Sequence, residues 1–184
     1  MSEEHIASQD QSHEAGAAES IGSIAVKFDA GASSRNKLLY ANGRMQVKVQ
    51  VVVTGVDRNG DVVAVSDEVM ESIRLIHYDS GKTLRNGWRA STEQGRFTLA
   101  VAHSTTVVED DGDEDLSGQR RVRAFWVSSE NVETVQIGAS IKLDNTVIRS
   151  NGTTLSSRHD SSISIEAILP VTYAIEQFRW ENVW

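Results

Sequence analysis

The pattern of hydrophobic and polar positions is clearest between Tyr40 and Val65, where residue type alternates along a long stretch. The apolar members of this alternation are Met45, Val47, Val49, Val51 and Val53. A period of two places them on one face of a strand and their polar neighbours on the other, so the stretch predicts a long, half-buried β-strand. Asn59-Gly60 follows and predicts a tight hairpin turn in which both residues have positive φ angles.

The same alternation recurs along the rest of the chain. We predict further strands at residues 21–29, 73–78, 88–91, 96–102, 122–128, 134–143 and 162–169, and at least one more within 171–184. Strand 88–91 is expected to pair with strand 96–102 as a hairpin. Ser66, followed by two acidic residues, is expected to cap one helical turn that runs through Ser72. Many short strands separated by turn residues predict an all-β fold, and we favour an antiparallel β-sandwich.

The N-terminal stretch differs in composition from the rest. Residues 1–20 contain five acidic residues and no Lys or Arg, within a chain whose net charge is −8. Low hydrophobicity with charge of one sign predicts a disordered acidic tail. The remaining residues, 21–184, suit one domain. The pattern leaves open whether residues 160–184 complete this sandwich, form an accessory strand segment or begin a further domain.

Composition excludes several classes of function. The chain has no cysteine, which excludes disulfides, thiolate catalysis, zinc ribbons and iron–sulfur clusters. A net charge of −8 argues against a nucleic-acid partner, because phosphate binding requires a basic face. No run approaches the roughly 20 apolar residues of a transmembrane segment. The N-terminus lacks the basic and apolar regions of a Sec signal peptide. These features fit a virion protein, a protein secreted by a leaderless route or a cytoplasmic protein.

Two segments resemble a known family. The segment YANGRMQVKVQVVVTGVDRNGDVV is similar to the opening of bacterial immunoglobulin-like modules of the invasin and intimin type. The segment FWVSSENVETVQIGASIKLDN resembles the closing strands of the same modules. Together these cover about 45 residues and are of the kind that many sandwich hairpins produce. The resemblance implies an immunoglobulin-like sandwich that acts as a spacer or binding module on a bacterial surface or extracellular particle, with no catalytic residues.

A run of acidic residues offers a candidate metal site. Six of the seven residues from Glu109 to Asp115 are acidic. A loose Ca²⁺ site at one end of the sandwich would use Asp110, Asp111, Asp113 and Asp115. An EF-hand is excluded, because Leu116 and Val122 occupy the positions of its Gly and Glu. The alternative is a solvated loop, without any cofactor, whose charge is balanced by Arg120, Arg121 and Arg123.

The aromatic residues offer a candidate binding surface. Phe178, Trp180 and Trp184 fall on one face of the expected C-terminal strand, and Trp88 and Trp126 lie in earlier strands. Exposed aromatic rings stack on sugars or dock a partner, whereas buried rings are core or an intersubunit surface. For the C-terminal residues we favour core or an intersubunit surface.

These observations lead to three functional hypotheses. The first is a non-enzymatic structural or binding module of a bacterial or phage extracellular assembly, such as a virion, tail, injection system or secreted toxin component, with a protein partner or self-association. The second is a lectin-like or toxin-like sandwich that binds glycans or membranes, with Ca²⁺ held by the acidic run. The third is a hydrolase, which requires a pocket where two carboxylates, or a His and an acid, converge. The first is favoured, because His77, His103 and His159 are scattered and no catalytic motif is complete.

Overall fold

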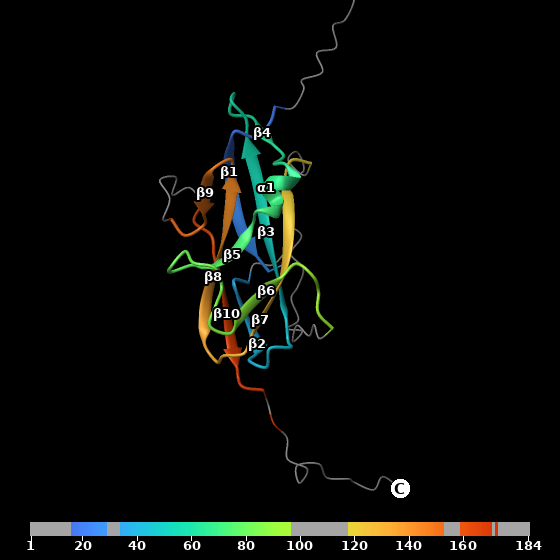
Figure 1. Cartoon of the computed structure of the whole chain (residues 1–184), viewed down its shortest axis with the longest axis vertical. Helices are drawn as coiled ribbons and strands as arrows, with labels where there is room; N and C mark the ends of the chain where they lie inside the picture. The colour runs from blue at the N-terminus through green and yellow to red at the C-terminus, as the bar shows by residue number, and fades with distance from the viewer. Residues whose placement is uncertain (1–15, 29–33, 97–117, 153–158, 171, 173–184) are drawn as a thin grey trace, which may run out of the picture.

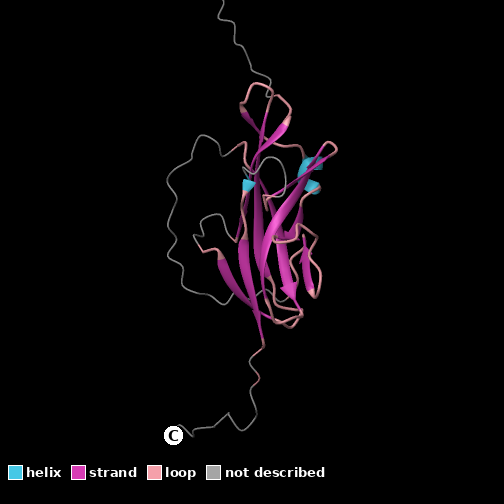
Figure 2. Cartoon of the chain, turned by 90° about the vertical axis from the view of Figure 1, so that its left-hand side faces the viewer, coloured by secondary structure: helices cyan, strands magenta, loops and turns pink. Residues whose placement is uncertain are grey.

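The chain folds into two β-sheets that pack face to face, as the alternating pattern predicts. The structure is a computed structural model, and it describes residues 16–28, 34–96, 118–152, 159–170 and 172. The first sheet contains, in spatial order, β1 (Ser20–Lys27), β3 (Val47–Val56), β7 (Arg121–Ser129) and β6 (Trp88–Ser91), with β4 (Val62–Val63) paired to β3 (Figure 1). We call it sheet A. The strands of both sheets run lengthwise, and the loops gather mainly at the two ends (Figure 2).

The second sheet, sheet B, completes the sandwich. It contains β2 (Asn36–Tyr40), β10 (Ile163–Ile168), β8 (Thr134–Leu143) and β5 (Arg74–His77), with β9 (Thr146–Arg149) paired to β8. Among the described strands every pair is antiparallel except β2 and β10, which run parallel. The prediction of an all-β, mainly antiparallel sandwich is therefore confirmed.

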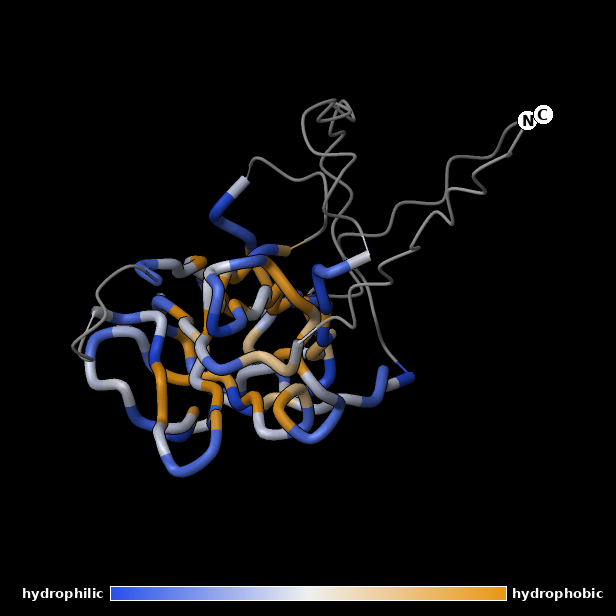
Figure 3. The backbone as a smooth tube through the Cα atoms, turned by 90° about the horizontal axis from the view of Figure 1, so that it is seen from above, coloured by the Kyte–Doolittle hydropathy of each residue, from blue (hydrophilic) through white to orange (hydrophobic). Residues whose placement is uncertain are grey.

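The core lies between the inner faces of the two sheets. Alternate residues of β3 point inward, and Val49, Val51 and Val53 are fully buried there. Ile137 on β8 and Ile165 on β10 face them from sheet B and are also buried. Hydrophobic segments gather inside and hydrophilic segments lie outside in the view along the sandwich (Figure 3). Burial of this apolar surface is the main term that stabilises the fold.

When β2, β4 and β9 are left aside, the order of the other described strands is the one found in immunoglobulin constant-type sandwiches. In those domains strands A, B, E and D form one sheet and strands C, F and G the other. Here β1, β3, β7 and β6 take the first four places in the same chain order, and β5, β8 and β10 take the other three. The Trp on strand C and the disulfide of antibody domains are absent, since β5 reads RLIH and the chain has no cysteine. The correspondence is one of strand order.

The turns correct one prediction. Gly60 has a φ angle of 91°, but Asn59 is not among the described residues with positive φ, so Asn59-Gly60 is not the tight hairpin turn expected. The Oδ1 atom of Asp57 instead accepts hydrogen bonds from the N–H groups of Asn59 and Asp61. Two consecutive positive φ angles occur at Asn86 and Gly87. A short polar side chain can replace the backbone geometry that a tight turn requires.

The start of the sandwich lies earlier than predicted. The N–H of Glu19 donates to the carbonyl oxygen of Val56, and its carboxylate accepts from Arg58. Ala18 packs against the core. Residues 16–20, which the composition placed in the tail, therefore belong to the folded part, while residues 1–15 lie outside the described residues.

The predicted helical turn is present and close to its expected position. The helix α1 (Asp67–Glu71) follows Ser66, whose side chain accepts a hydrogen bond from the N–H of Val69. Strand 88–91 pairs with β7. The strands expected at 96–102 and 171–184 fall almost wholly outside the described residues, and only Arg96, Pro170 and Thr172 near them are described.

Candidate binding surface

A small apolar groove lies where β2 and β10 end, at the end of the sandwich opposite α1 (Figure 1). Its volume is about 120 Å³, and its lining consists of Leu38, Leu39, Tyr40, Met45 and Ile168. Tyr40 contributes the one polar side chain of this lining. A cavity with this lining favours an apolar guest, because a polar guest would lose its hydrogen bonds to water.

The turn after β2 builds one wall of the groove. The Oδ1 atom of Asn42 accepts hydrogen bonds from the N–H groups of Arg44 and Met45, and Gly43 has a φ angle of 66°. This turn brings Met45 back beside β2, where its sulfur accepts the N–H of Tyr40 at 3.2 Å. Met45 is thereby buried at the base of the groove, just before β3 begins.

The free edge of β2 is closed at both of its ends and open in the middle. Asn36 bonds through its N–H and its carbonyl to the hydroxyl of Ser34. The N–H of Tyr40 donates to Met45, and its carbonyl accepts the N–H of Asn42. Strand alternation directs the backbone groups of Leu38 to the same edge, between these two closed positions. Edge strands that are short and locally bonded resist uncontrolled pairing. Among the described residues, Leu38 is the one position of this edge whose backbone groups have no partner, which makes it available to another strand.

Two leucines extend the apolar surface beyond the groove. Leu38 is 43% exposed on the outer face of sheet B, and Leu169, directly after β10, is 72% exposed. Ile168, which precedes Leu169 in the chain, lines the groove. We call the groove together with Leu38 and Leu169 the open end. Exposed apolar side chains that adjoin an apolar groove are typical of a contact surface.

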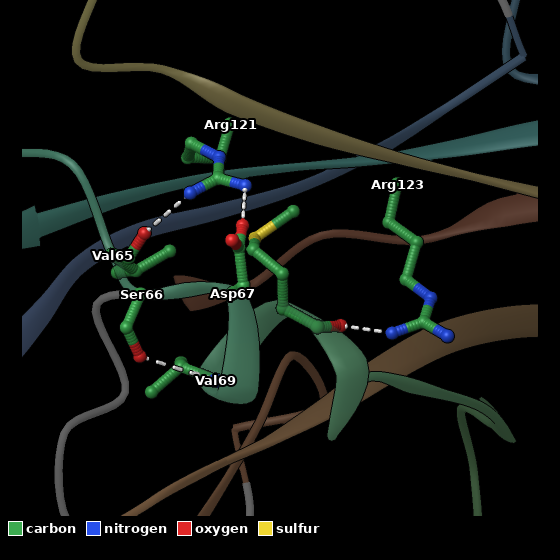
Figure 4. Close-up of polar contacts among 7 residues, drawn as sticks. Val65, Ser66, Asp67, Val69, Arg121 and Arg123 are labelled. Carbon is green, nitrogen blue, oxygen red and sulfur yellow. Dashed lines mark hydrogen bonds and ion pairs between the residues drawn. The ribbon is translucent and has the colours of Figure 1, made fainter.

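The opposite end is closed by arginines on β7 (Figure 4). Arg121 donates to the carbonyl of Val65 and forms an ion pair with Asp67. Arg123 donates to the carbonyl of Met70 in α1 and stacks over the ring of Phe125. These two arginines join β7 to the helix. The interpretation that they also balance the acidic run stays a prediction, because residues 109–115 lie outside the described residues.

The described tryptophans do not form a common site. Trp88 is 2% exposed, and its indole N–H donates to Glu133 at 2.6 Å, so its ring belongs to the core rather than to a ligand surface. Trp126 is half-buried on the outer face of sheet A, where the strand register places it between Lys48 and Ser91. Its ring is the one described member of the predicted aromatic set that remains accessible.

The other predicted site residues lie outside the described part of the chain. These are Asp110, Asp111, Asp113, Asp115, Phe178, Trp180 and Trp184. Within the described ranges, His, Asp and Glu residues form no group of three or more that could hold a metal ion. The Ca²⁺ site therefore stays a prediction.

One titratable pair has a shifted pKa. The hydroxyl of Tyr78 donates a hydrogen bond to the carboxylate of Asp160, which raises the pKa of the phenol above its ordinary value. Slight burial and the charges of Asp160 and Asp79 act in the same direction. A raised pKa keeps this phenol protonated at neutral pH, so it is not activated as a base or nucleophile.

The sequence pattern did not reveal the groove. Leu38 and Leu39 are adjacent and point to different faces, and Met45 and Ile168 join them only through the turn and the parallel pair. The one signal available from sequence was the pair of apolar residues Leu169-Pro170 directly after an alternating strand, because proline ends a strand in the open.

Comparison of the chain with protein-family models, with curated proteins and with solved structures found no match. In the described residues no helix is long and apolar enough to cross a bilayer.

Proposed function

We propose that the chain is a non-enzymatic structural or binding module that contacts its partner through the open end. The supporting observation is the apolar groove at the end of β2 and β10, flanked by exposed Leu38 and Leu169. Its lining has no carboxylate, histidine or other group suited to acid–base work. An apolar surface on a rigid sandwich favours association over chemistry.

The setting we propose is a bacterial or phage extracellular assembly. Support comes from the resemblance to bacterial immunoglobulin-like modules, from the cysteine-free composition and from a strand order like that of immunoglobulin domains. The open end gives such a module an exposed apolar surface through which it can contact a neighbour.

Light scattering after size exclusion tests the proposal. We expect a mass above the 20.2 kDa of one chain, rising with concentration. A strict monomer at all concentrations would count against self-association as the form of the contact. The partner that contacts the open end would then be a different protein.

A glycan-binding role is the alternative, and Trp126 is the observation that favours it. A half-buried indole between Lys48 and Ser91 offers one face for stacking on a sugar and polar neighbours for hydrogen bonds. A glycan array measured with and without EDTA tests this role. Glycan binding that is lost in Trp126→Ala would support this role. The absence of glycan binding both with and without EDTA would rule it out.

A further inference from the structure

We propose that residues 173–184 of one copy dock into the groove of a second copy, so that two copies exchange their C-terminal segments. This inference rests on the proposed function and names the partner of the open end as a second copy of this chain. The groove, the path of the chain after β10 and the bonding of the β2 edge each support it.

The groove matches the chemistry of the segment. A cavity of roughly 150 Å³ lined by apolar side chains accepts a benzene ring. The groove here, at about 120 Å³, is somewhat smaller than that and opens to solvent, so it takes up part of one aromatic ring. Residues 173–184 contain Phe178, Trp180 and Trp184 at even-numbered positions, which an extended chain presents on one side. Trp180 is the middle one of the three, and we take its ring as the one that enters the groove.

The path of the chain favours a second copy over the same copy. After β10 the described residues Leu169, Pro170 and Thr172 are exposed, and the ribbon leaves the sandwich at its lower end (Figure 1). The segment thus starts outside its own sandwich. To reach its own groove, which lies beside Ile168, the chain would have to reverse direction after leaving the sandwich. When two grooves face each other across a twofold axis, each segment starts beside the groove of its neighbour.

The edge of β2 limits how the segment can bind. Only Leu38 directs its backbone groups to the open part of this edge, because Asn36 and Tyr40 are locally bonded. Docking would therefore consist of one aromatic side chain in the groove and one residue of backbone pairing. It would also cover the exposed side chains of Leu38 and Leu169, which removes apolar surface from water.

The test uses single substitutions in the full chain. Leu38→Arg places a charge at the groove, and Glu166, the neighbour of Leu38 across the β2–β10 pair, gives the new guanidinium a partner that preserves the fold. Trp180→Glu changes the segment and leaves the groove intact. Val147→Arg is the matched control, because Val147 is 41% exposed on β9 of the same sheet and does not line the groove. Leu169→Arg repeats the test at a fully solvated position if Leu38→Arg unfolds.

We expect Leu38→Arg and Trp180→Glu each to weaken self-association by on the order of tenfold, since a charge is excluded from an apolar groove. Val147→Arg should associate as the parent chain does. An equimolar mixture of the two impaired variants should recover dimers, because a mixed pair retains one intact groove with one intact segment. Light scattering measures the parent chain, the three variants and the mixture, and far-UV circular dichroism verifies folding.

Several results would overturn the inference. If both variants associate as tightly as the parent, the assembly proposal survives and the contact lies elsewhere. If the mixture recovers no dimers, the segments are not exchanged. If the parent is monomeric and Leu38→Arg shifts its tryptophan emission to longer wavelength, the segment occupies its own groove. A monomeric parent whose emission does not shift removes both the exchange and self-association as the proposed function.

Discussion

The two ends of the sandwich terminate their sheets in different ways. At the α1 end, Arg121 and Arg123 reach from β7 to backbone carbonyls of the helix region, and Met70 and Ile73 are buried beneath. At the open end, Leu38 and Leu169 remain exposed beside a groove that no described side chain fills. The difference is that side chains of the described residues cover one end, whereas apolar side chains stay exposed at the other.

The largest expected effect comes from a cavity at the closed end. Ile73 is fully buried there, so Ile73→Ala should lower the free energy of unfolding by about 3 kcal/mol through lost burial and an unfilled cavity. Leu38→Ala at the open end should lower it by less than about 0.5 kcal/mol, because that side chain is already partly solvated. Urea unfolding of both variants checks the contrast, and equal losses would show that the two ends do not differ.

The second effect concerns arginines at the two ends. Arg123→Ala should lower the free energy of unfolding by about 1–2 kcal/mol. The substitution removes a hydrogen-bond donor from the carbonyl of Met70 and the guanidinium that stacks on Phe125. Arg89→Ala is the control at the other end of β7, where Arg89 and Glu130 form an exposed ion pair at 3.0 Å. That pair should contribute less than about 0.5 kcal/mol to the free energy of unfolding. Thermal unfolding at matched pH measures both, and a larger loss for Arg89→Ala would reverse the assignment.

The smallest expected effect concerns the exposed ion pair between Arg121 and Asp67 at the α1 end. Asp67 is largely exposed and Arg121 is partly exposed. Their ion pair should therefore contribute only about 0.5 kcal/mol to the free energy of unfolding. A double-mutant cycle with Asp67→Asn and Arg121→Gln isolates this coupling energy. High salt should reduce this coupling, since exposed charges are screened. Chemical unfolding with and without added salt checks it. A coupling that salt leaves unchanged would mean that the pair is more shielded than its exposure indicates.

Local signals allowed much of the fold to be predicted. Strand β8 was expected at residues 134–143 and spans Thr134–Leu143, because strict alternation marks both its ends. The helix after Ser66 was expected because a serine followed by acids satisfies the free amides of a first turn. Both signals are carried by residues close in sequence, and tertiary contacts did not override them.

Long-range features could not be predicted in the same way. Nothing near Leu38 indicates that it will pair in parallel with β10, and the groove depends on that pair. The sequence around Trp88 does not show whether its ring is buried or exposed. Its hydrogen bond to Glu133 and its pairing opposite Ser129 place the ring in the core. The contacts of Arg121 and Arg123 with Val65, Asp67 and Met70 were not predicted, because these partners lie about 50 residues away in the sequence.

The parallel pair of β2 and β10 has a consequence for biosynthesis. Sheet A draws its strands from residues up to Ser129, whereas β2 gains its neighbour only when Ile163–Ile168 have left the ribosome. We therefore expect sheet A to assemble during translation, while β2 stays unpaired until residue 168 has emerged. Closing such a distant contact is slow, because the entropy of a long intervening loop is lost before the pairing is gained.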